Sequence, residues 1–123
     1  MIKKKNEIDT DLGPVESVFA DLVWENEPLK TSALVRLCAE KLNWKRTTTY
    51  TVLKKFCERG LFRMENSVVS AVIPRSEFYA LKSERFVEEE FDGSLAAFVS
   101  AFASVKKISP EELEELRRMI EEY

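Results

Sequence analysis

The sequence has 123 residues, of which 45% are hydrophobic and 33% charged, and its net charge is −3. This length predicts one domain, or one small domain with an assembly arm, and the apolar content is too high for a disordered chain. No apolar run approaches the roughly 20 residues that a membrane-spanning helix needs. No apolar segment follows the basic start MIKKKNEIDTDLG either, so we expect a cytoplasmic protein without membrane insertion.

Residue types that carry catalytic chemistry are scarce. The chain has no histidine, so no Ser–His or Cys–His nucleophilic pair can form. Its two cysteines, Cys38 and Cys57, fall on apolar positions of predicted helices and indicate buried thiols rather than a disulfide or zinc site. The glutamate-rich stretches at 88–90 and 111–115 are typical of solvated helix faces rather than of acid/base or metal sites. We therefore expect no enzyme, no metal and no other cofactor.

The charge is distributed unevenly along the chain. Residues 43–63 carry six basic and one acidic side chain, whereas residues 1–42 and 64–123 have net charges of −2 and −6. A basic segment in an acidic protein indicates a polyanionic partner. A solvated helix face is the alternative explanation.

The first part of the chain predicts two helices. Residues 1–11 are polar and are expected to form a flexible arm. A helix begins at Gly13-Pro14 and ends before Pro28, and its apolar residues recur at helical spacing. Thr31 is a candidate N-cap for a second helix over 32–42. The inward-facing residues of the two helices are Val15, Val18, Phe19, Leu22, Val23, Leu34, Leu37, Cys38 and Leu42.

A third helix is predicted within the segment 43–60, NWKRTTTYTVLKKFCERG. One face is apolar, and Gly60 follows the last apolar position, where a positive φ is common. The opposite face and the flanks carry hydroxyl groups and cations. Two helices joined by a short link, the second bearing such side chains near its start, form a helix-turn-helix. The predicted apolar face consists of Thr49, Val52, Leu53, Phe56 and Cys57.

After Gly60 the pattern changes to strands. Residues 61–65 and 68–73 are rich in β-branched and apolar residues and flank the polar turn Glu65-Asn66-Ser67, and Pro74 ends the second run. A two-stranded hairpin after three helices predicts a winged helix over 12–74. The fold class is therefore mainly α with a small β-hairpin, in which the hairpin lies on the helical core.

Residues 75–123 predict three further helices. The first covers about 75–91 and ends at Asp92-Gly93, Ser94 caps the second, and Ser109-Pro110-Glu111-Glu112 forms a capping box for the third. So short a segment cannot bury its apolar stripes alone, so we expect a helical dimerisation domain; packing on the winged helix is the alternative. The residues expected to form the dimer contact are Leu95, Phe98, Val99, Phe102, Leu113, Leu116, Met119 and Ile120.

The third helix supplies the predicted contacts to double-stranded DNA. Threonine offers a hydroxyl group and a methyl group to base edges, so Thr47, Thr48 and Thr51, together with Tyr50, are the candidates for base contacts. Thr48 is equally a candidate helix N-cap, and Tyr50 a candidate for packing on the first helix. The candidates for phosphate contacts are Lys45, Arg46, Lys54, Lys55, Arg59 and Arg63.

With these elements in place, the chain resembles the BlaI/MecI family of penicillinase repressors. The first helix has Glu16 followed eight residues on by Trp24, and Thr31 precedes the second helix. The third helix resembles the family's recognition segment, Thr-Thr and then Thr-x-Leu-x-x-Leu-x-x-x-Gly. Here that pattern is carried by Thr47, Thr48, Thr51, Leu53, Phe56 and Gly60.

The resemblance implies a homodimeric transcriptional repressor that binds a palindromic operator. It also implies relief of repression by a sensor protease, with cleavage near Ala101-Phe102 in the dimerisation region. The chain ends without the paired cysteine motifs of the family's copper-responsive branch. Two alternatives from the residues remain open: a winged-helix adaptor that binds protein instead of DNA, and a repressor that responds to a small molecule bound between the winged helix and the C-terminal helices.

Overall fold

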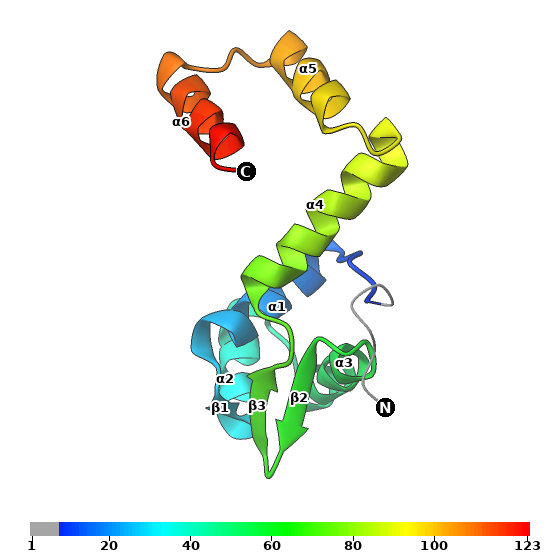
Figure 1. Ribbon diagram of the computed structural model, residues 1–123. Helices are drawn as coiled ribbons and strands as arrows, with labels where there is room; N and C mark the ends of the chain where they lie inside the picture. Colours follow the sequence, from blue (N-terminus) through cyan, green and yellow to red (C-terminus); the bar gives the residue numbers. More distant parts are fainter. Residues whose placement is uncertain (1–7) are drawn as a thin grey trace. The chain divides into compact units, whose positions relative to one another are not determined.

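The computed structural model describes residues 8–123, and Figure 1 shows the order of the helices and strands in this part of the chain. The residues form two compact units, an N-terminal unit that extends to Ser83 and a C-terminal unit, Glu84–Tyr123. The predicted fold class is confirmed: helices dominate, and a small sheet completes a winged helix. The elements are α1 (Pro14–Asn26), β1 (Leu29–Lys30), α2 (Thr31–Leu42), α3 (Arg46–Glu58), β2 (Phe62–Glu65), β3 (Val68–Ala71), α4 (Arg75–Phe91), α5 (Leu95–Val105) and α6 (Pro110–Glu121).

The starts of α2 and α3 differ from the prediction. Thr31 is not an N-cap: Lys30 holds that position, and Thr31 is the buried first residue of α2. Thr48 is not an N-cap either, because α3 already begins at Arg46 after Lys45, and no side chain caps it. Both threonines are therefore within their helices. The sequence rule failed here because a lysine without a side-chain cap bond, rather than a hydroxyl-bearing residue, holds each N-cap position.

The sheet has three strands where a two-stranded hairpin was predicted. β1 pairs antiparallel with β3, with Leu29 opposite Val69, and β3 pairs with β2. Asn66 and Ser67 both have positive φ, which suits the tight turn between β2 and β3. The Thr31 N–H donates to the Ser67 carbonyl at 2.9 Å, so the wing turn is fixed to the start of α2. β1 was missed because two residues are too few to show strand alternation.

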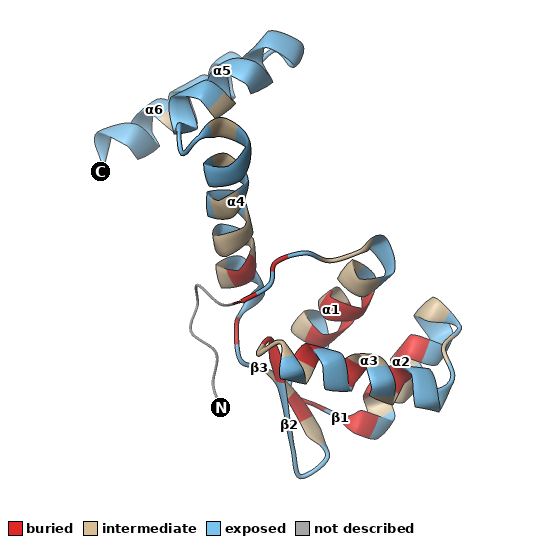
Figure 2. Cartoon of the chain, turned by 90° about the vertical axis from the view of Figure 1, so that its right-hand side faces the viewer, coloured by how far each residue is buried: buried red, intermediate tan, exposed pale blue. Residues whose placement is uncertain are grey.

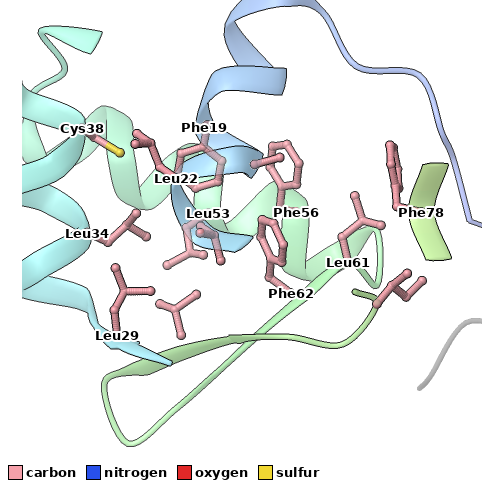
Figure 3. Close-up of a cluster of buried hydrophobic side chains, with 14 of the residues drawn as sticks. Phe19, Leu22, Leu29, Leu34, Cys38, Leu53, Phe56, Leu61, Phe62 and Phe78 are labelled. Carbon is pink, nitrogen blue, oxygen red and sulfur yellow. The ribbon is translucent and has the colours of Figure 1, made fainter. Parts of the chain in front are cut away.

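A cluster of aromatic rings forms the core of the N-terminal unit. Phe56 of α3 lies 5.0 Å from Phe19 of α1 and 5.3 Å from Phe62 of β2, measured between ring centroids. Figure 3 shows these rings among the leucines of α1, α2 and α3. Since β1, α2 and β3 add Leu29, Leu34 and Val69 to the same buried core, the position of α3 depends on the whole unit.

The N-terminal unit extends into α4, beyond the predicted boundary at residue 74. Phe78 is fully buried, and its ring lies 5.4 Å from that of Trp24. The Trp24 indole N–H donates to the Ile73 carbonyl at 3.0 Å, and Arg75 Nε donates to Asp21 Oδ1 at 3.0 Å. These contacts assign the first turns of α4 to the winged helix.

The prediction of a flexible arm over 1–11 is wrong for the residues that the structure describes. Ile8 is 2% exposed and belongs to the core, and Thr10 is also buried. The guanidinium of Arg59 donates to the carbonyl oxygens of Asp9 and Asp11 at 2.8 and 2.7 Å. An apolar side chain and a cation therefore hold this segment on the helical core. The rest of the predicted arm, residues 1–7, lies outside the described residues.

The C-terminal unit has helices but no buried core. Ser94 Oγ accepts from the Ala97 N–H and Ser109 Oγ accepts from the Glu112 N–H, as the predicted caps require. No residue of α5 or α6 is buried, and both helices appear almost entirely exposed in Figure 2. The apolar side chains of these helices are left without a covering layer within this unit.

The aromatic cluster predicts a large effect of shortening Phe56. Phe56→Ala should lower the free energy of unfolding by about 3–5 kcal/mol, because a buried ring is lost from a packed site. Chemical denaturation followed by circular dichroism measures the change. Lys55→Ala, at the exposed neighbouring position, is the matched control and should change this free energy by less than about 0.5 kcal/mol. Equal effects of the two substitutions would contradict the packing described here.

A second prediction concerns the contacts that Arg59 makes with residues 9 and 11. Arg59→Ala should lower the free energy of unfolding by about 1–3 kcal/mol, because two charge-assisted hydrogen bonds to carbonyl groups are lost. The amide protons of residues 8–11 should also exchange faster with solvent. Hydrogen exchange read by NMR tests this, with Arg63→Ala as a control that should leave exchange in this segment unchanged.

Candidate nucleic-acid interface

The inward face of α3 fixes the direction of its outward face. Thr49, Leu53 and Phe56 are buried, at the spacing of one side of a helix. The Thr49 hydroxyl donates to the Lys45 carbonyl at 3.2 Å. Its side chain also hydrogen-bonds the thiol of Cys38 on α2, whose pKa burial raises above its ordinary value. The buried side of α3 therefore matches the prediction, with Val52 and Cys57 partly buried at its edges.

The predicted base-contact threonines lie on the outward face of α3. Thr47, Thr48 and Thr51 are all exposed. The Thr51 hydroxyl donates to the Thr47 carbonyl at 2.9 Å, one turn back along the helix. This bond uses the hydroxyl proton, so Thr51 keeps its oxygen lone pairs as acceptors and its methyl group for apolar contact.

Most of the predicted phosphate contacts are exposed cations without an acidic partner. Within residues 8–123, no ion pair or side-chain hydrogen bond involves Lys45, Lys54, Lys55 or Arg63. Ammonium and guanidinium groups without an acidic partner can neutralise an external anion without first breaking an internal ion pair. The structure thus brings together one face of hydroxyl groups bordered by available positive charge.

Tyr50 connects α3 to α2 rather than to the first helix. Its hydroxyl hydrogen-bonds the side chain of Thr31, and this bond is the main reason why the pKa of Tyr50 lies below its ordinary value. The guanidinium of Arg46 lies 5.5 Å from the centroid of the Tyr50 ring. Because Thr31 also binds the wing turn through its backbone, Tyr50 and Thr31 together couple α3, α2 and the wing. Nothing in the sequence pattern indicated this role for Thr31.

Arg59 differs from the other predicted phosphate contacts. Its side chain is only 18% exposed, and besides the two carbonyl bonds it lies 3.6 Å from the carboxylates of Asp9 and Glu16. Its charge is therefore directed to acidic groups of the same chain. We assign Arg59 a role in the fold of the N-terminal unit.

A groove separates α3 from the wing strand β2 and was not foreseen from the sequence. It has a volume of about 720 Å³. Two apolar wing residues, Met64 and Val72, remain 47% and 43% exposed at its wall. Cys57 also lines it; burial raises the pKa of this thiol, which forms a hydrogen bond with the backbone of Met64. The only sign of this groove in the sequence was the pair of apolar residues at positions 64 and 72, on either side of the turn between β2 and β3.

The predicted dimer contacts lie on α5 and α6 of the C-terminal unit. Leu95 and Ile120 are 63% and 71% exposed. Phe98 is partly buried by the rings of Phe86 and Phe91, which lie 5.9 and 5.5 Å away. Ala101 and Phe102, the predicted cleavage position, lie within α5 and are both exposed.

Comparison with known proteins agrees with the resemblance stated above. A family model described as penicillinase repressor matches residues 12–122. A penicillinase repressor from Bacillus licheniformis is 23% identical over 106 residues, which cover 83% of each chain. Within residues 8–123, no helix is both long and apolar enough to span a membrane. Because the family match covers nearly the whole chain, this protein belongs to the penicillinase repressor family, a family of DNA-binding transcriptional repressors rather than of enzymes.

Proposed function

We propose that this protein acts in the cytoplasm as a homodimer that represses transcription by binding a palindromic operator. The observation that carries the proposal is the outward face of α3, where exposed threonines stand beside cations that have no acidic partner in the described chain. In a helix-turn-helix, such a face enters the major groove of DNA. The opposite face is buried, so docking requires no rearrangement of the core.

We assign two kinds of DNA contact to this surface, contacts to base edges and contacts to phosphates. Thr47, Thr48 and Thr51 read base edges, because a threonine hydroxyl accepts or donates hydrogen bonds and its methyl group matches that of thymine. Lys45, Lys54 and Lys55 neutralise phosphates and supply affinity that falls steeply with salt. Arg46 and Tyr50 stabilise the start of α3. The guanidinium of Arg46 lies over the Tyr50 ring, and the Tyr50 hydroxyl hydrogen-bonds Thr31.

The C-terminal unit forms the proposed contact with the second copy of the chain. Its helices α5 and α6 have no buried residues, and their apolar stripes include Leu95, Phe102 and Ile120. A second copy that contributes the same stripes would cover this surface and form a twofold interface. The acidic charge of this part of the chain keeps it away from DNA. Two α3 helices would then meet half-sites about one helical turn, or a multiple of it, apart.

Proteolysis by a sensor protease is the proposed route to relief of repression. The bond between Ala101 and Phe102 lies within α5, on residues that are exposed in the single chain. Cleavage there would separate Phe102 and α6 from the rest of the dimer contact. Loss of the dimer would lower operator affinity, because each half-site would then be bound by one chain alone.

Paired substitutions on α3 test the division between phosphate and base contacts. Lys55→Ala should weaken binding to all DNA sequences and reduce the salt slope by about one unit, whereas Thr51→Ala should also relax sequence preference. Fluorescence anisotropy on operator and unrelated duplexes, at several salt concentrations, measures both effects. Lys41→Ala on α2 is the control and should change neither. An adaptor that binds only protein would show no salt-dependent DNA affinity and would tolerate charge reversal at position 55.

Charge placed on the apolar stripe of α6 tests the dimer. Ile120→Glu should shift sedimentation equilibrium from dimer toward monomer by at least about tenfold in dissociation constant, because a carboxylate would be buried without a partner. Glu121→Gln, at the next position but without an apolar contact to lose, should leave the dimer intact. A wild-type protein that is monomeric at micromolar concentration would contradict the proposed assembly.

A further inference from the structure

The groove between α3 and β2 has the size and lining of a small-molecule site. Its volume of about 720 Å³ falls within the range of pockets that enclose drug-sized ligands. The apolar part of its wall comes from both elements and from the residue that follows β3. These residues are Leu53, Cys57, Phe62, Met64 and Val72.

The apolar wall is unusual for its position. A wing beside a DNA-contacting helix is expected to carry polar or basic side chains, yet Met64 and Val72 are each more than two-fifths exposed here. Neither side chain belongs to the buried core, to which β2 and β3 contribute Phe62 and Val69. Their exposed apolar surface would be covered by a ligand that fills the groove.

The rim of the groove is polar and carries an excess of positive charge. Lys54 and Arg63 both line it, and neither forms an ion pair within the described part of the chain. Glu65 is the acidic residue of the lining. Tyr50 also lines the groove, and its ring lies 5.5 Å from the guanidinium of Arg46.

From the apolar wall and the two free cations we infer that this groove binds a small amphipathic anion. Such a ligand has an aromatic or branched aliphatic body and one carboxylate, sulfonate or similar group. Its body would lie against Cys57, Met64 and Val72, and its charge would pair with Lys54 and Arg63. Charge complementarity favours an anion over a cation of the same size, because the lining has two positive groups and one negative group.

Occupation of the groove would compete with DNA. Lys54 and Arg63 are the same cations that phosphates would use, and a bound body would fill the space between α3 and the wing. This competition rests on the proposed function, whereas binding of the anion to the groove does not. A repressor built in this way would release its operator in response to an amphipathic acid, without any cut in its chain.

The inference is tested by NMR titration of the ¹⁵N-labelled full chain with naphthalene-2-sulfonate. Saturable shifts are expected for the backbone amides of Cys57, Met64 and Val72. The neutral analogue 2-naphthalenemethanol should bind at least about fivefold more weakly, because it cannot pair with Lys54 and Arg63. Shifts confined to α5 and α6, or equal affinity for the neutral analogue, would overturn the inference.

Two substitutions at exposed apolar positions provide a matched comparison. Met64→Glu places a carboxylate at the wall of the groove and should weaken binding of naphthalene-2-sulfonate at least about tenfold through repulsion and loss of apolar contact. Val18 of α1 was predicted to face inward but is 42% exposed, close to the 47% of Met64, and Val18→Glu should leave binding unchanged. Equal loss in both variants would overturn the assignment to this groove.

Competition between DNA and the small anion is tested by a separate NMR measurement. Addition of a saturating unlabelled duplex should return the amides of Cys57 and Val72 to positions independent of naphthalene-2-sulfonate. Persistence of the probe-dependent shifts in the DNA-bound protein would overturn the competition. If the protein bound no DNA, the titration without duplex would still report on the groove, so failure of the proposed function and failure of this inference are distinguishable.

Discussion

The packing of α3 through Thr49, Leu53 and Phe56 is the constraint on which the rest of the structure depends. These three side chains leave Thr47, Thr48 and Thr51 exposed on the other side of the helix. Phe56 touches rings from both α1 and the wing, so the direction of the helix is set by elements that are distant in sequence. A surface that recognises DNA needs this kind of support, because hydrogen bonds to base edges tolerate little displacement.

Much of this arrangement follows from helical periodicity in the sequence. The apolar positions of α1 and α3 recur at three- and four-residue spacing, and Pro14, Pro28 and Gly60 mark boundaries that the structure reproduces. The bounds of α4 and α5 also agree with prediction, since Asp92-Gly93 and Ser94 have conformations and bonds that end one helix and start the next. Local rules therefore succeed at these boundaries, although they failed at the starts of α2 and α3.

Apart from the starts of α2 and α3, the features that the sequence did not predict are long-range. β1 is defined by its pairing with β3, and no pattern within Leu29–Lys30 shows this. Thr31 gains its importance from a wing turn 36 positions later and from a tyrosine on another helix. Ile8 is a single apolar residue in a polar stretch, so periodicity gave no reason to place it in the core. The groove likewise exists only because α3 and β2 lie side by side.

The bonds between Arg59 and residues 9 and 11 also bear on how this sequence can change in evolution. The acceptors are backbone carbonyl groups, which every amino acid possesses. Positions 9 and 11 can therefore drift among many residue types while the attachment of the segment persists. The residue at position 59 has less freedom, since one nitrogen at the end of its long side chain donates to both carbonyl groups, and a short or uncharged side chain cannot replace it. Arg59 can therefore keep residues 9 and 11 attached to the helical core while the side chains at these two positions change.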